Sequence, residues 1–264
     1  MVRLLSFVAA FTGLFLSAAL DAQPAAAPLA LPERRVAPPP PPLTAENSWV
    51  LDLSTGGRVV IQLRPDVTPA TVERIKTLTR QGFYNGLTFF RVVEGFMAQG
   101  GDPQNVGTGG STLPDLQAEI NGLPHLRGAV ALARTADNLN SGNSQFYIMF
   151  VPRLQMDRGY TVFGRVVSGM NFVDALERGE PPPAPSRIVR ASLGSDNLPP
   201  MSAEELRAAA AQLAATQPVT AAGPTRNSAI GPAMPPPQAP PRALEPVRAP
   251  GAPPGRPRPQ RPPT

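Results

Sequence analysis

The stretch FFRVVEGFMAQGGD, residues 89–102, decides the fold class of this chain. It contains parts of two short apolar runs, at 87–93 and 95–99, which favour β-strands over a helix. Turns rich in Gly, Asn and Asp separate these runs from further runs of the same kind. The additional runs cover 128–133, 145–151, 160–167 and 186–193.

The segment SGNSQFYIMF, residues 141–150, shows how the faces of one such strand are used. Gln145 and Tyr147 are two positions apart and therefore share one face of the strand. We expect Phe146 and Ile148, on the other face, to point into the core.

The remaining elements fix the fold class. WVLDLSTGGRVVIQL, from Trp49, alternates apolar and polar residues around a Thr-Gly-Gly turn and predicts a hairpin. One helix should begin at Pro69, carry Val72, Ile75 and Leu78 on one apolar face, and stop at Gly82. A second helix should cover 170–177. Eight strands with two helices predict a mainly β fold: a closed eight-stranded antiparallel barrel with two capping helices. Closure removes the exposed edges that an open sheet must protect.

Three separated segments also carry a resemblance to a known family: 89–102, 141–150 and YTVFGRVVSGM at 160–170. In this order and at this spacing they resemble the cyclophilins, the barrel-shaped peptidyl-prolyl cis–trans isomerases. The likeness includes GFYNGLTF at 82–89 and GTGG at 107–110. The cyclophilin-like domain is expected to occupy 47–197.

The resemblance implies that Arg91 is the catalytic arginine and that no cofactor is needed. It implies a substrate site built from Phe96, Met97 and Gln99 on the floor and wall of a proline pocket, Gln145 and Tyr147 on a neighbouring strand, Ala133 and Arg134 along the peptide groove, and Met156 and Tyr160 closing the pocket. The implied partners are unfolded or partly folded proteins that carry X-Pro bonds.

These residue types suit rotation about an X-Pro bond, which is slow because amide resonance raises a barrier of ~18–20 kcal/mol. When the bond twists, the imide nitrogen becomes a hydrogen-bond acceptor that a fixed guanidinium can reach. An apolar pocket disfavours the polar planar form by removing water. Arg91 beside Phe96, Met97 and Tyr147 has the chemistry for both effects.

The sequence departs from the family pattern at four positions. Phe90 replaces a histidine that is not a proton donor, so activity should survive. Gln155 replaces a tryptophan that contacts cyclosporin, so we expect weak inhibition by that drug. Tyr147 replaces a phenylalanine, and its hydroxyl must find a partner or reach water. Tyr160 replaces a histidine.

Proline marks the segments outside this domain. Eight of the 36 prolines lie in 24–42 and sixteen in 216–264. We expect an Ala/Pro-rich linker at 23–46, with Pro38 to Pro42 extended and its backbone solvated. Residues 198–264 should form a short helix at about 203–215, followed by a disordered Pro/Arg-rich tail.

The N-terminus has the order of a secretory signal: Arg3, an apolar stretch to Leu20 and small residues up to Ala22. A signal peptide at 1–22 predicts export to the periplasm of a bacterium. The alternative is an uncleaved inner-membrane anchor, because about 17 apolar residues is the lower limit for a bilayer span.

Composition excludes several function classes. The chain has no cysteine, so disulfides and thiolate metal sites are excluded, and His125 is its only histidine, so a multi-histidine metal site is excluded. We expect His125 to be an exposed turn residue.

The net charge of +5 comes from the tail, and the domain itself is nearly neutral. A neutral domain gives no reason to expect nucleic-acid binding. We expect a monomer whose tail contacts anionic envelope surfaces weakly.

Two alternatives remain at this stage. The first is a catalytically weak or inactive member of the same fold, a proline-peptide binding module with Pro-rich arms as tethers. The second is a β-barrel carrier of small apolar ligands, which only the number of strands supports.

Overall fold

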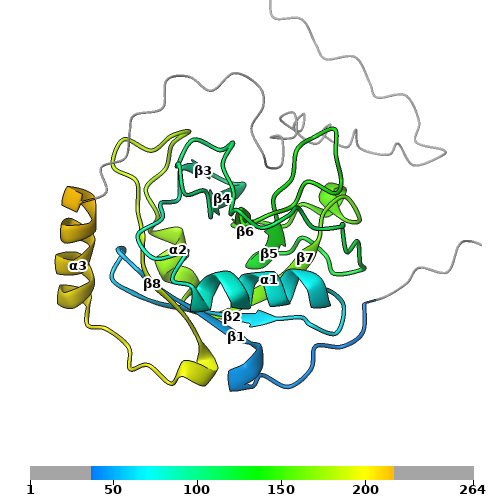
Figure 1. Cartoon of the computed structure of the whole chain (residues 1–264), viewed down its shortest axis with the longest axis horizontal. Helices are drawn as coiled ribbons and strands as arrows, with labels where there is room; N and C mark the ends of the chain where they lie inside the picture. The colour runs from blue at the N-terminus through cyan, green and yellow to red at the C-terminus, as the bar shows by residue number, and fades with distance from the viewer. Residues whose placement is uncertain (1–36, 217–264) are drawn as a thin grey trace, which may run out of the picture. The chain divides into compact units, whose positions relative to one another are not determined.

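The computed structural model describes residues 37–216, and their eight strands form one antiparallel sheet (Figure 1). The strand order is β3-β4-β6-β5-β7-β2-β1-β8. The strands are β1 (Ser48–Leu53), β2 (Gly57–Leu63), β3 (Arg91–Val93), β4 (Met97–Gly100), β5 (Ala129–Leu132), β6 (Phe146–Met149), β7 (Val162–Ser168) and β8 (Ile188–Leu193). The helices are α1 (Pro69–Arg80), α2 (Met170–Asp174) and α3 (Ala203–Thr216), with 3-10 turns η1 (Ala45–Asn47), η2 (Leu154–Met156) and η3 (Gly194–Asp196). The predicted eight-stranded antiparallel fold is confirmed.

The two ends of the strand order, β3 and β8, do not form a ladder with each other, and only isolated bridges join the chain around them. Thr88 pairs with Arg187, and Val92 pairs with Gly179. The run predicted at 87–93 is a strand only in its last three residues, so the sheet curls without a continuous ladder at this junction. The closure predicted from the sequence is therefore only partial in hydrogen bonding.

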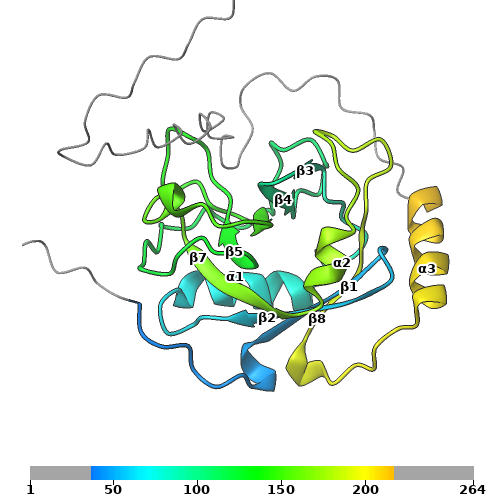
Figure 2. The same cartoon turned by 180° about the vertical axis from the view of Figure 1, so that it is seen from behind.

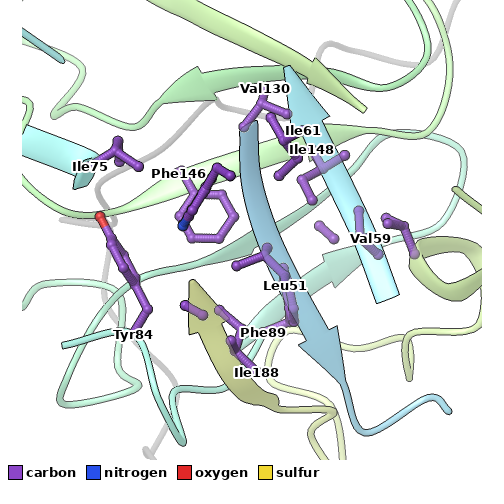
Figure 3. Packing of buried hydrophobic residues seen from close by; sticks show 14 of the residues in the cluster. Leu51, Val59, Ile61, Ile75, Tyr84, Phe89, Val130, Phe146, Ile148 and Ile188 are labelled. Atoms are coloured by element: carbon purple, nitrogen blue, oxygen red, sulfur yellow. The ribbon is translucent and has the colours of Figure 1, made fainter. Parts of the chain in front are cut away.

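The main core lies between the inner face of the sheet and α1 (Figure 3). Phe146 and Ile148 of β6 belong to it, as the alternation of β6 predicts. Trp49 packs edge-on against Phe146, with ring centroids 4.9 Å apart. The apolar face of α1, predicted from the spacing of Val72, Ile75 and Leu78, is buried in the same core.

The predicted solvation of the Pro38–Pro42 backbone is wrong for three of its carbonyls. The carbonyls of Pro38, Pro41 and Pro42 accept hydrogen bonds from Arg64, Gln62 and Asn47 respectively, at 2.9, 2.7 and 2.9 Å. Polyproline leaves its carbonyls without partners inside the segment, so donors on β2, directly after β2 and on η1 can bind them. We call residues 37–46 the proline strap.

Beyond β8, a cluster of charges fastens the chain to the sheet. Buried Asp52 accepts hydrogen bonds from Arg58 and Arg190, and both arginines also donate to the carbonyl of Pro199. The following helix α3 lies at the side of the sheet, beside the turn of the β1–β2 hairpin (Figure 2). Leu206 is its one buried residue.

The predicted signal peptide at 1–22, most of the 23–46 linker and the tail after residue 216 lie outside the described residues. Within residues 37–216, no helix has the length and apolar character needed to span a bilayer.

Candidate active site

A row of directly opposed residues crosses the sheet at the candidate site. Arg91 on β3 is opposite Gln99 on β4, and Gln99 is opposite Tyr147 on β6. Tyr147 is in turn opposite Ala131 on β5. Strands are spaced at about 4.8 Å, so this register brings a guanidinium, an amide and an aromatic ring to adjacent positions on one face.

On this face, a second apolar cluster forms that is separate from the main core. Of the residues implied by the resemblance, the cluster contains Phe96, Met97, Ala133 and Tyr147, and Met156 and Tyr160 pack against it. The alternation of β4 and β6 explains the separation, because Ala98 and Ile148 belong to the main core while Met97 and Tyr147 face the other way. The structure therefore brings together side chains that the sequence analysis grouped only by resemblance.

Arg91 is held at the edge of this cluster by a carboxylate and an amide. Its Nε donates to Oε2 of Glu180 at 2.6 Å, and its Nη1 donates to Oε1 of Gln99 at 3.4 Å. Its side chain is only 14% exposed. The guanidinium is therefore fixed beside the apolar cluster instead of extending into bulk solvent.

Glu180 reaches Arg91 because Gly179 pairs with β3. The backbone N–H of Val92 donates to the Gly179 carbonyl at 2.8 Å, and the reverse bond is 2.9 Å. Gly179 has φ +149°, and a Cβ there would lie 2.5 Å from Cα of Pro182. Only glycine fits this conformation and this space, so the bridge depends on glycine at this position.

The two glutamines form a buried chain behind Arg91. Nε2 of Gln99 donates to Oε1 of Gln145 at 2.9 Å, and Nε2 of Gln145 donates to the Gly109 carbonyl at 2.7 Å. Each amide therefore has a fixed orientation, with the Gln99 oxygen turned toward Arg91.

Ala133 and Arg134, the implied peptide groove, follow directly after β5. The N–H of Ala133 donates to the Gln145 carbonyl at 2.9 Å. The guanidinium of Arg134 lies 4.5 Å above the ring of Tyr160, and its Nε donates to the Gly159 carbonyl. Arg134 is thus tied to Tyr160 and has a defined orientation.

The prediction that His125 is an exposed turn residue is wrong, because its side chain is fully buried. Its Nε2 lies 3.0 Å from the hydroxyl of Tyr147, and its Nδ1 lies 2.9 Å from Oδ1 of Asp157. The Tyr147 hydroxyl has therefore found a polar partner inside the protein. The sequence suggested exposure because His125 follows a proline in a loop, but the loop folds beneath β6.

Burial governs the protonation of this group of rings. Desolvation lowers the pKa of His125, and the hydrogen bond to Asp157 opposes that effect. Desolvation also raises the pKa of Tyr147 well above its usual range, with a smaller contribution from Tyr160. The pKa of Tyr160 is raised by burial as well, and the charges of Arg134 and Arg91 oppose the shift. At neutral pH, all three rings are therefore uncharged.

Sequence reasoning missed Glu180, and it misjudged His125 and did not connect it with Asp157. The contacts of these residues join positions 89 and 32 apart in the chain, which no local pattern signals. Among residues 37–216, no group of three histidine, cysteine or acidic side chains is placed to hold a metal ion.

Comparisons with known proteins bear on the family to which the chain belongs. Residues 50–193 match the family described as cyclophilin type peptidyl-prolyl cis-trans isomerase/CLD. A probable peptidyl-prolyl cis-trans isomerase of Brucella suis biovar 1 (strain 1330) is 44% identical over 167 residues, covering 57% of this chain and 84% of the relative. Peptidyl-prolyl cis-trans isomerase B of Bacillus subtilis (strain 168) is 38% identical over 128 residues, covering 48% of this chain and 89% of the relative.

A solved structure shows the same arrangement of strands and helices. The cyclophilin AquaCyp293 from Hirschia baltica superposes with a TM-score of 0.54 at 28% identity, covering 60% of this chain and 77% of that protein. The family match covers more than half of this chain, and the two curated relatives carry the same activity in their names. The chain therefore belongs to the cyclophilin family and is a peptidyl-prolyl cis–trans isomerase.

Proposed function

We propose that this isomerase accelerates X-Pro rotation in unfolded and partly folded proteins of the cell envelope, with Arg91 stabilising the twisted imide. The observation that carries the mechanism is the position of Arg91, which Glu180 and Gln99 hold beside the cluster of Phe96, Met97 and Tyr147. A charge next to an apolar surface is the combination that this reaction needs.

The reaction makes and breaks no covalent bond, so the catalyst has only to bind the twisted imide better than the planar forms. A guanidinium N–H directed at the imide nitrogen contributes about 1.5–3 kcal/mol, which corresponds to about tenfold to hundredfold in rate. Arginine suits this role because its planar fork stays charged and presents several donors in fixed directions.

The remaining site residues bind and orient the peptide. The apolar cluster receives the pyrrolidine ring and removes water from the imide, which disfavours the polar planar form. The buried chain of Gln99 and Gln145 orients Arg91, and the segment Ala133-Arg134 offers polar groups to the peptide backbone. The fixed orientations of these groups support the role, because preorganised donors need no rearrangement when substrate binds.

The site of action follows from the N-terminal sequence. The charged, apolar and small-residue order of residues 1–22 supports export, with cleavage after Ala19 or Ala22. Fractionation of cells and N-terminal sequencing of the mature chain test this. A full-length chain in the cytoplasm contradicts export, and a full-length chain in the inner membrane supports the anchor alternative.

Replacing Arg91 tests the mechanism. We expect Arg91→Ala to lower kcat/KM by about a hundredfold on an Ala-Pro peptide, measured by NMR exchange. The kcat/KM of Arg91→Lys should lie between those of the unaltered chain and Arg91→Ala. Arg207→Ala, on the exposed surface of α3, should leave activity unchanged. Urea denaturation checks that each variant is folded.

The same experiment separates the enzyme from the binding module. Loss of exchange with an unchanged unfolding midpoint supports the proposed role of Arg91. Full activity in Arg91→Ala overturns it. Peptide binding by the unaltered chain without any exchange supports the non-catalytic module instead.

A further inference from the structure

A buried chain of hydrogen bonds lies beneath the apolar cluster and has no part in the mechanism described above. We call this chain the relay. It runs from Asp157, directly after η2, through His125 to the hydroxyl of Tyr147 on β6. Oδ1 of Asp157 accepts both the backbone N–H of His125, at 2.8 Å, and the ring Nδ1–H, at 2.9 Å. A single carboxylate oxygen thus fixes both the loop and the ring.

The partners determine the tautomer of His125. A carboxylate only accepts hydrogen bonds, so Nδ1 carries the proton of the neutral ring. Nε2 then has a lone pair and accepts the hydrogen bond from the Tyr147 hydroxyl at 3.0 Å. The hydroxyl proton of Tyr147 therefore points at His125.

The surrounding rings leave little freedom for this arrangement. The rings of His125 and Tyr147 are nearly parallel, at 11°, and Tyr160 meets both of them edge-on. The titratable and charged groups that face His125 are Asp157, Tyr147 and Tyr160, with Arg134 above Tyr160. The backbone carbonyl of His125 accepts from the N–H of Arg153.

We propose that His125 is a positioning residue that sequesters the hydroxyl of Tyr147, so that a tyrosine presents only its apolar ring to the substrate proline. This inference rests on the proposed function in one respect, the place of Tyr147 in the proline site. It accounts for a tyrosine at a position where the family pattern has phenylalanine. A buried hydroxyl without a partner would be unfavourable in such a site.

This role makes activity depend on pH through one group. A protonated His125 has no lone pair at Nε2, so it cannot accept from Tyr147, and the hydroxyl must turn. Burial disfavours the charged ring, so the loss occurs as the pH falls below about 6.5, the ordinary pKa of histidine. Above that pH, the relay is intact.

The first experiment detects the hydrogen bonds of His125 by NMR and needs no catalytic assay. His125 is the only histidine, so 15N-histidine labelling of the full chain gives a single set of ring signals. We expect the Nδ1–H tautomer at pH 7.5 and a shift of the Nε2 signal in Tyr147→Phe. The matched control Tyr84→Phe removes another fully buried hydroxyl, bonded to the Ser144 carbonyl in the main core, and should leave the ring signals unchanged.

The second experiment tests positioning through kinetics. We expect His125→Leu to lower kcat/KM about tenfold in the unaltered background, and to have no effect in the Tyr147→Phe background, where no hydroxyl needs a partner. His125→Gln, whose side-chain oxygen can accept from Tyr147, should recover most of the activity. NMR exchange between pH 5 and 8 should show acid inactivation in the unaltered chain but not in Tyr147→Phe.

Several outcomes overturn the proposal. An Nε2–H tautomer, or an Nε2 signal that ignores Tyr147→Phe, shows that the relay does not exist. Equal effects of His125→Leu in both backgrounds show that His125 acts on stability alone. If the unaltered chain catalyses no exchange, the proposed function fails, while the ring signals still test the relay independently. If His125→Leu does not fold, the pH profiles of activity in the unaltered chain and in Tyr147→Phe still test the proposal. Acid inactivation of the same size in both overturns it.

Discussion

Arg91 owes its orientation to a carboxylate 89 positions later in the chain. Glu180 binds Nε, so the rotation of the guanidinium about its own stem is fixed before a substrate arrives. The proposed catalytic role of Arg91 gains from such fixing, because misplacement of a catalytic group by about 1 Å can cost a hundredfold in rate. We therefore propose that Glu180 positions Arg91.

Replacing Glu180 measures that contribution. We expect Glu180→Gln to lower kcat about threefold to tenfold with little change in KM, because a neutral amide holds the guanidinium less firmly. Glu94→Gln is the matched control, since Glu94 binds Nε of Arg178 at the same distance of 2.6 Å but outside the site. Equal losses in the two variants would argue against a positioning role for Glu180.

His125 also makes stability depend on pH. Desolvation lowers its pKa in the folded protein, so the unfolded chain binds more protons below about pH 6.5. The contribution of the neutral ring is present above that pH and is lost as the pH falls through the lowered, folded-state pKa. We expect the urea midpoint to fall less between pH 7.5 and 5 in His125→Gln, which cannot titrate, than in the unaltered chain. An equal fall of the urea midpoint in the two proteins would contradict a His125 ring that is buried and neutral.

Among the elements, α1 shows how tertiary structure completes a local pattern. Pro69 begins the helix as the sequence predicts, but Thr68 makes no capping hydrogen bond with its side chain. Glu119 accepts from the N–H groups of Ala70 and Thr71 at 2.9 and 2.8 Å instead. A carboxylate at a helix N-terminus satisfies free donors and complements the helix dipole.

Removal of this cap should lower the stability of the fold and leave the isomerase activity unchanged. We expect Glu119→Ala to lower the free energy of unfolding by about 1–2 kcal/mol, the usual cost of a lost cap, with kcat/KM unchanged. Glu73→Ala, an exposed residue within α1 that pairs with Lys76 at 3.6 Å, should cost much less. Chemical denaturation measures both, and similar costs would refute capping by Glu119.

At the scale of the whole molecule, the proline strap extends the folded unit before β1. Arg64 is nearly buried, and it donates to both Asp66 and Pro38. Deletion of residues 1–36 keeps the strap, whereas deletion of residues 1–46 removes it. We expect the longer deletion to be less stable by about 3 kcal/mol or more, because it removes the three side-chain hydrogen bonds to Pro38, Pro41 and Pro42 and three more that involve Thr44. Equal midpoints for the two deletions would show that the strap contributes nothing to stability.

The tail remains a prediction from sequence at this scale. Its six arginines and sixteen prolines predict weak contact with anionic surfaces and no packed core. Its residues after 216, like the signal at 1–22, lie outside the described part of the chain.

The sequence by itself determined the strands, the buried face of α1 and the family, because local periodicity and short motifs specify backbone conformation and the faces of an element. The division of β6 into Tyr147 and its core neighbours was predictable for the same reason. Only the tertiary structure decided the partners: Glu180 for Arg91, His125 for Tyr147, Glu119 for α1 and Arg64 for the proline strap. A polar contact depends on which distant segments the register of the sheet brings within about 3 Å, and no local pattern carries that information.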